Sequence, residues 1–159
     1  MIAANVADEL KAFQPTSQTA LKSNKLKTLN NVLIVEDDTS LAHLLWLVLE
    51  RMAPNVKVDW VTSGEEAKYN LSSDGDEMAD CPYDLVIADI FLDGDITGLD
   101  IWKLCDGQYP ETNILVTSSL PTDKFASCLK NEFDCPPYLP KPFTMSECIE
   151  MISEFIEQD

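Results

Sequence analysis

The stretch that decides the fold is Val-Leu-Ile-Val-Glu-Asp-Asp, residues 32–38. Four consecutive apolar residues are typical of a strand that is covered on both faces of a sheet. Residues 85–89, Leu-Val-Ile-Ala-Asp, repeat the arrangement with a single aspartate at the end. The carboxyl ends of parallel strands lie at one edge of a sheet, so we expect the two acidic groups to meet there.

Three further apolar runs complete a predicted sheet of five strands. They are Val56–Val61, Ile114–Thr117 and Tyr138–Pro140. The first of these alternates apolar and polar residues, which predicts an edge strand with one exposed face. Pro140 has no N–H to donate to a neighbouring strand, so the last run is also expected at an edge.

Helical patterns occupy the connections between these runs. Residues 41–52 carry apolar side chains at the spacing of one helix face. Three sequences of the capping-box type predict further helix starts, namely Ser63-x-x-Glu66, Thr97-x-x-Asp100 and Thr144-x-x-Glu147. A weaker helix is expected within residues 122–130. The last helix is expected to have an apolar face made of Cys148, Ile152, Phe155 and Ile156.

Five strands that alternate with five helices predict an α/β fold with a doubly wound parallel sheet. We assign this domain to residues 31–159. Residues 1–30 are expected to be an N-terminal extension and linker, either a flexible tail or a short helix that docks on the domain or on a second copy of the chain. The apolar residues that would line such a helix are Ile2, Val6, Leu10 and Phe13.

The acidic character of the chain narrows the classes of function. Its net charge of −17 repels phosphate backbones, so no direct contact with nucleic acid is expected. No apolar run is long enough for a membrane span and no secretory signal pattern is present, so we expect a cytoplasmic protein with no membrane contact. The five cysteines and the single histidine show no zinc-binding spacing.

The expected edge of the sheet gathers groups that suit phosphoryl chemistry. Glu36, Asp37 and Asp89 follow two of the strands, and converging carboxylates resist joint ionisation unless a cation compensates. Mg²⁺ prefers oxygen ligands and is the expected cofactor. Thr117 adds a hydroxyl at the end of the fourth run, and Lys141 adds an ammonium after the fifth. This set suits transfer of a phosphoryl group to a carboxylate.

Four segments resemble, in order and approximate spacing, the signatures of response-regulator receiver domains. They are VLIVEDD (residues 32–38), DLVIAD (84–89), ILVTS (114–118) and YLPKPFT (138–144). Each segment alone is a weak signal, whereas the ordered set is specific and covers roughly residues 30–158. The resemblance implies a flavodoxin-like receiver fold, with five helices and the strand order 2-1-3-4-5.

The resemblance also implies a role for each residue at this edge. Asp89 would be the phosphoryl acceptor. Glu36 and Asp37 would hold Mg²⁺ together with Asp89, and the backbone carbonyl of Phe91 would be a further ligand.

Three more roles follow from the same resemblance. Thr117 would bond the acyl phosphate, and Lys141 would pair with it. Tyr138 would be the switch aromatic, which turns inward when Thr117 moves toward the phosphate. The peptide bond between Lys141 and Pro142 would be cis, a conformation that is confined almost entirely to proline.

Two features depart from the family pattern. Asp93 stands where the family usually has proline, and the loop of residues 93–97 is one residue longer than usual. Phe91 stands where polar side chains help to orient a hydrolytic water in the family. We therefore expect slow self-dephosphorylation.

Three acidic segments have a second interpretation. Residues 93–97 resemble the D-x-D-x-T motif of haloacid-dehalogenase-type phosphatases, but the other acidic residues precede the motif here, which disfavours that class. Residues 74–77 resemble a calcium loop without the full ligand pattern. Asp38 is expected either to cap the first helix or to be solvated.

The expected function is that of a stand-alone response-regulator receiver. It would take a phosphoryl group from a sensor histidine kinase or a histidine phosphotransfer protein and signal to a downstream protein target, with a second copy of the chain as another candidate partner. It would catalyse only its own phosphorylation and dephosphorylation. The alternatives are a non-phosphorylated, receiver-like interaction scaffold and a phosphorelay intermediate.

Overall fold

The structure is a computed structural model, and it describes residue 26 and residues 28–72, 80–127 and 135–156. Its five strands form one sheet in which all paired neighbours are parallel, in the order β2-β1-β3-β4-β5. The strands are Asn31–Val35 (β1), Lys57–Val61 (β2), Leu85–Asp89 (β3), Asn113–Ser118 (β4) and Tyr138–Pro140 (β5). The predicted strand order is therefore confirmed, and both predicted edge strands lie at edges.

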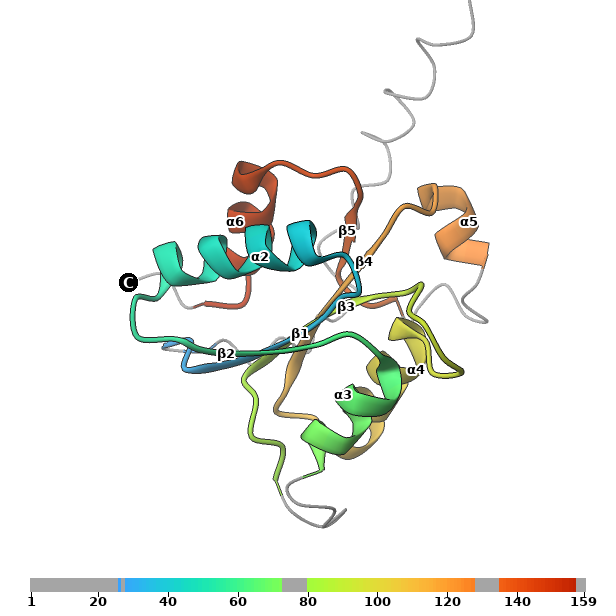
Figure 1. The fold of residues 1–159 in the computed structure, drawn as a ribbon, viewed down its shortest axis with the longest axis horizontal. Helices are drawn as coiled ribbons and strands as arrows, with labels where there is room; N and C mark the ends of the chain where they lie inside the picture. The colour runs from blue at the N-terminus through green and yellow to red at the C-terminus, as the bar shows by residue number, and fades with distance from the viewer. Residues whose placement is uncertain (1–25, 27, 73–79, 128–134, 157–159) are drawn as a thin grey trace, which may run out of the picture.

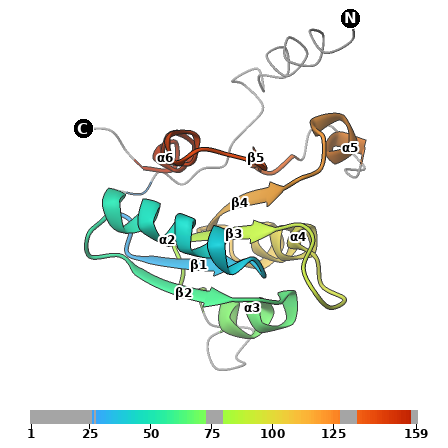
Figure 2. The same ribbon diagram turned by 45° about the horizontal axis from the view of Figure 1, so that its top comes forward.

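Helices cover both faces of the sheet (Figures 1 and 2). The described helices are Thr39–Met52 (α2), Gly64–Leu71 (α3), Gly98–Gln108 (α4), Thr122–Ser127 (α5) and Met145–Ser153 (α6). The buried hydrophobic residues of α2 and α6 belong to one core cluster, and those of α3, α4 and α5 belong to the other. Within the described residues, no helix combines the length and the apolar character needed to cross a bilayer.

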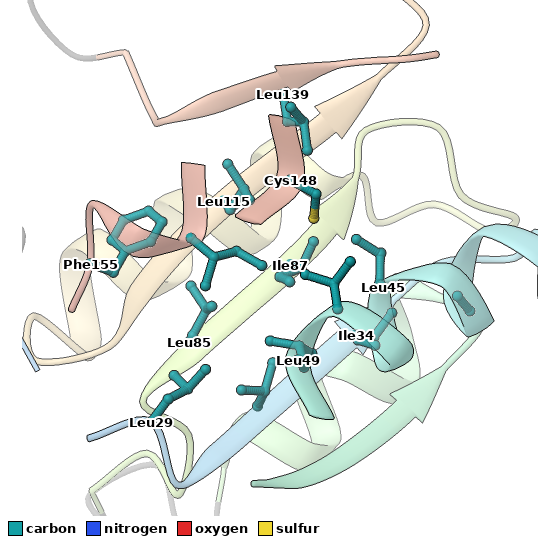
Figure 3. Packing of buried hydrophobic residues seen from close by; sticks show 14 of the residues in the cluster. Leu29, Ile34, Leu45, Leu49, Leu85, Ile87, Leu115, Leu139, Cys148 and Phe155 are labelled. Atoms are coloured by element: carbon teal, nitrogen blue, oxygen red, sulfur yellow. The ribbon is translucent and has the colours of Figure 1, made fainter. Parts of the chain in front are cut away.

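Strand β1 shows how the sheet divides the core. Val32 and Ile34 belong to the cluster under α2 and α6, whereas Leu33 and Val35 belong to the cluster on the opposite face. Successive side chains of a strand point to opposite faces, so a strand buried on both sides needs a continuous apolar run. Figure 3 shows the first of these clusters, in which Ile34 shares one core with side chains from α2 and α6.

Side-chain caps fix where the helices begin. Thr97 and Thr144 each accept from the third backbone N–H of their helix, and Asp100 and Glu147 complete both predicted capping boxes. The predicted box at Ser63 forms only by half, because the Glu66 carboxylate accepts from the N–H of Thr62 and not from that of Ser63. Asp38 is the N-cap of α2, where its carboxylate accepts from two backbone N–H groups.

The C-terminal helix is shorter than predicted. Helix α6 ends at Ser153, after which tighter turns form, with the N–H of Phe155 donating to the Ile152 carbonyl at 3.1 Å. Phe155 is still buried, as predicted, whereas Ile156 forms an isolated parallel bridge with Leu26. Leu29 is also buried in the core. The domain boundary at residue 30 stays a prediction, and the helix predicted near the N-terminus lies outside the described residues.

Candidate functional site

The candidate site lies where the carboxyl ends of β1, β3 and β4 meet. Glu36 directly follows β1, Asp89 is the last residue of β3, and Thr117 pairs with Asp89 in the register between β3 and β4. All three side chains are buried, and Lys141, which follows β5, bonds the two carboxylates. The parallel sheet thus gathers residues that are far apart in the sequence.

A single ammonium group bridges two buried carboxylates. Lys141 Nζ lies 2.8 Å from Glu36 Oε2 and 2.9 Å from Asp89 Oδ2. Burial raises the pKa of Glu36, although the hydrogen bond from Lys141 opposes that effect. Burial lowers the pKa of Lys141, but its hydrogen bonds to Glu36 and Asp89 outweigh this and hold the pKa above the usual value. Lys141 is therefore a cation at neutral pH.

The described residues include one group of three acidic side chains that could hold a metal ion. Ligand oxygens of Glu36, Asp37 and Asp89 all lie within 4.8 Å of one another, and Asp37 is exposed. Three carboxylates face one ammonium, and converging carboxylates resist joint ionisation unless a cation compensates. An all-oxygen ligand set that is open on one side is the kind that Mg²⁺ accepts. The residues present therefore fit a divalent cation.

Two backbone groups orient the buried carboxylates. The N–H of Phe91 donates to Asp89 Oδ1 at 3.2 Å, and the N–H of Asp38 donates to Glu36 Oε1 at 3.1 Å. The side chain of Phe91 is 56% exposed, so an apolar ring faces solvent two residues beyond Asp89. That the backbone carbonyl of Phe91 is a metal ligand stays a prediction.

Thr117 is the one buried side chain of the described residues whose polar atom lacks a hydrogen-bond partner. The residue is fully buried, and its Oγ1 meets no acceptor or donor. An unsatisfied buried hydroxyl costs about 1–3 kcal/mol. Residues paired in register on parallel strands point to the same face, so this hydroxyl lies on the Asp89 side of the sheet.

The long loop after β3 is held against the start of α3. Glu65 Oε1 accepts from the backbone N–H of Asp95 at 2.9 Å and from that of Ile96 at 3.3 Å, and the first of these bonds lowers the pKa of Glu65. Gly94 has φ +104°, in the region that favours glycine. A glycine turn and a glutamate clamp thus hold this loop in place.

Gly94→Ala is expected to lower the free energy of unfolding by about 1–3 kcal/mol, since it forces a positive φ on a side chain. A Cβ at this position would also lie 2.6 Å from Glu65 Oε2, which would disrupt the clamp. Urea unfolding measures the loss. The matched control is Gly107→Ala within α4, where a Cβ meets open space and a gain of up to about 1 kcal/mol is expected. Equal effects of the two substitutions would contradict this account.

The phosphatase interpretation of residues 93–97 loses support in the structure. Thr97, the last residue of that motif, bonds Asp100 and caps α4. Asp93 forms an isolated bridge with Ser63, and it is not part of the acidic group described above. The calcium-loop residues 74–77 lie outside the described residues.

Tyr138 ties strand β5 to the loop after β4. Its hydroxyl donates to the carbonyls of Leu120 at 2.7 Å and Ser118 at 3.0 Å, and its half-buried ring stacks on Phe125 with centroids 4.0 Å apart. The peptide bond between Lys141 and Pro142 is cis, as the resemblance implies.

Sequence reasoning missed three residues around the site. Trp60 donates its indole N–H to the backbone carbonyl of Glu36 at 2.7 Å, Glu65 clamps the loop after β3, and Phe125 stacks on Tyr138. The available signals were faint, since Trp60 is simply an aromatic residue in an alternating edge strand. His43 is exposed and takes no part in the described site.

Comparison with known proteins agrees with this geometry. The sequence profile of the family described as "Response regulator receiver domain" matches residues 32–153. A search of curated protein sequences found no match to this chain.

Solved structures share the fold at low sequence identity. The chemotaxis response regulator CheY4 of Vibrio cholerae is 21% identical with a TM-score of 0.64, over 81% of this chain and 100% of that one. A response regulator receiver protein from Sinorhizobium medicae is 23% identical with a TM-score of 0.64, over 80% and 94%. The response regulator DrrB of Thermotoga maritima, an OmpR/PhoB homolog, is 23% identical with a TM-score of 0.62, over 80% of this chain; this chain covers 52% of DrrB.

Proposed function

Because the chain belongs to the family of response regulator receiver domains, we propose that Asp89 accepts a phosphoryl group from a sensor histidine kinase or a histidine phosphotransfer protein. The protein then signals to a downstream protein target, or to a second copy of itself, through contacts that depend on phosphorylation. The observation that carries this proposal is the buried Asp89 carboxylate, bonded to Lys141 and grouped with Glu36 and Asp37.

The transfer exchanges one bond to phosphorus for another. A carboxylate oxygen of Asp89 attacks the phosphorus of a phosphohistidine, the P–N bond breaks, and the released imidazole takes a proton from solvent. Glu36, Asp37, Asp89 and the Phe91 carbonyl would hold Mg²⁺, which when bound neutralises charge on the phosphoryl oxygens.

The other residues respond to the new phosphoryl group. Lys141 already bonds Asp89 Oδ2, so its ammonium lies beside the oxygens that would be added. The hydroxyl of Thr117 lacks a partner among the described residues, and it gains one by donating to a phosphoryl oxygen. Thr117 precedes Ser118, whose carbonyl accepts from Tyr138, so a shift of Thr117 reaches β5. The surface that changes therefore includes the loop after β4, α5 and β5.

Intact mass spectrometry tests the proposal. Incubation with acetyl phosphate and Mg²⁺ is expected to add one phosphoryl group, about 80 Da, to the wild type and none to Asp89→Asn. Chelation of the metal should suppress the adduct. Asp93→Asn is the matched control and should retain it. Loss of the adduct in Asp93→Asn but not in Asp89→Asn would move the acceptor to the long loop and revive the phosphatase interpretation. If neither acetyl phosphate nor a purified histidine kinase gave an adduct, the interaction scaffold would be favoured.

The exposed ring of Phe91 bears on the lifetime of the acyl phosphate. An apolar side chain two residues beyond Asp89 offers no hydrogen bond to an attacking water, so hydrolysis is expected to be slow. Phe91→Asn supplies a donor and an acceptor, and it should speed phosphate loss by at least about tenfold. The measurement is the decay of the phosphorylated mass with time. Leu92→Asn is the neighbouring control, and equal decay in the two variants would contradict a role for position 91.

A further inference from the structure

Two residues of strand β2 form hydrogen bonds with the backbone carbonyl and the backbone N–H of Glu36. The indole Nε1–H of Trp60 donates to the Glu36 carbonyl at 2.7 Å, and the N–H of Glu36 donates to the Val61 carbonyl at 3.1 Å. Trp60 lies in the edge strand and is 39% exposed. A half-exposed indole could donate to water instead, so burial alone does not require this bond.

The carbonyl that Trp60 bonds belongs to the peptide unit that joins Glu36 to Asp37. A peptide unit is planar, so fixing its carbonyl direction also fixes the N–Cα bond of the next residue. The two side chains differ in how they are held: the Glu36 carboxylate is bonded by Lys141 and by the N–H of Asp38, whereas the exposed Asp37 carboxylate has no hydrogen bond among the described residues. Its place beside Asp89 is set by the backbone that carries it.

We infer that Trp60 is a positioning residue for Glu36 and Asp37. Its indole fixes the peptide unit that joins these two residues and thereby the position of the Asp37 carboxylate as a ligand. This inference rests on the proposed Mg²⁺ site at Glu36, Asp37 and Asp89. Trp60 itself touches neither the ion nor the phosphoryl group. Because its indole is bonded to the turn that carries the ligands, its fluorescence should also report occupation of the site.

The test measures Mg²⁺ binding by calorimetry with the chain of 159 residues. Trp60→Phe keeps an aromatic ring and removes the N–H donor. It is expected to raise the dissociation constant for Mg²⁺ by about three- to tenfold, the worth of one ordinary hydrogen bond. Trp46→Phe is the matched control, since Trp46 on α2 is similarly exposed and has no bond to Glu36 or Asp37. Its dissociation constant should equal that of the wild type.

A second measurement leaves Trp60 in place. In the variant with both Trp46→Phe and Trp102→Phe, Trp60 is the one remaining tryptophan of the chain. Its emission should change on addition of Mg²⁺ and saturate at the dissociation constant found by calorimetry. If Trp60 served stability alone, Trp60→Phe would have a lower melting temperature but the same dissociation constant for Mg²⁺ as the wild type. The emission of Trp60 in the double variant would then not change on addition of Mg²⁺.

The outcomes separate this inference from the function on which it rests. If the wild type binds Mg²⁺ and Trp60→Phe binds it equally well, the positioning role is overturned and the proposed function stands. If Trp60→Phe does not fold, an unchanged Trp60 emission at saturating Mg²⁺ overturns the role instead. If the wild type does not bind Mg²⁺ at all, the proposed metal site is wrong, and the inference about Trp60 is wrong with it.

Discussion

Lys141→Met is expected to lower the free energy of unfolding by about 3 kcal/mol at pH 7 when no divalent cation is present. Lys141 is the ammonium that bonds both Glu36 and Asp89, and the two carboxylates are almost fully buried. Methionine fills a similar volume but leaves these charges without compensation. Urea unfolding with a chelator present measures the loss, and added Mg²⁺ should restore part of it.

The loss should depend on pH in a defined direction. Burial raises the pKa of Glu36 above 4.5, so this residue favours folding when it is protonated and loses that contribution as the pH rises through its folded-state pKa. Without Lys141 that pKa rises further. The difference between Lys141→Met and the wild type should therefore be largest near pH 7 and shrink as the pH falls toward 4.5.

Lys124 is an exposed lysine on α5, and the control variant Lys124→Met removes the same charge from the surface. Its effect should stay within about 0.5 kcal/mol at both pH values. If the two lysine variants were equally stable, the bridging ion pair would contribute nothing to the folded state. A loss that grew toward low pH would have the opposite sign to the one derived from Glu36.

Thr117→Val is expected to separate stability from switching. The hydroxyl of Thr117 is buried and has no partner in the part of the chain that the structure describes, so replacing it by a methyl group should raise the free energy of unfolding by about 1 kcal/mol. Asp89 should still accept the phosphoryl group. The phosphorylated variant should nevertheless lose most of the structural response, because no hydroxyl follows the phosphoryl oxygens.

Amide hydrogen exchange of the loop after β4 and of β5 measures that response. In the wild type, phosphorylation should change amide exchange at residues 118–120 and at Tyr138 and Leu139, and the change should be small in Thr117→Val. Thr117→Ser keeps the hydroxyl and should keep the response. A full response in Thr117→Val would mean that the signal leaves the site by another route.

Most of the fold could be predicted because its signals are local. The continuous apolar run of β1 predicts burial on both faces, and the box sequences at Thr97 and Thr144 predict two helix starts. The apolar run of residues 85–88 places Asp89 at the end of β3. The parallel arrangement of the strands then brings it to the same end of the sheet as the acidic residues that follow β1. The approximate position of the candidate site follows from the same local patterns.

Contacts between distant segments could not be predicted from local patterns. Trp60 bonds a carbonyl 24 residues away, and Glu65 bonds an N–H 30 residues away. Neither bond leaves a periodic or spaced signal in the sequence. The half-formed box at Ser63 shows the same limit, because the Glu66 carboxylate has a choice of two neighbouring N–H groups and the loop geometry decides between them.

The central claim is that Asp89 accepts the phosphoryl group, and chemical trapping of the acyl phosphate tests it most directly. Borohydride reduces an aspartyl phosphate to homoserine, so phosphorylated protein treated with borohydride and digested shows by peptide mass spectrometry which aspartate was modified. We expect homoserine at position 89 and at no other aspartate. Homoserine at position 37 or 93, with none at 89, would contradict the assignment of the acceptor.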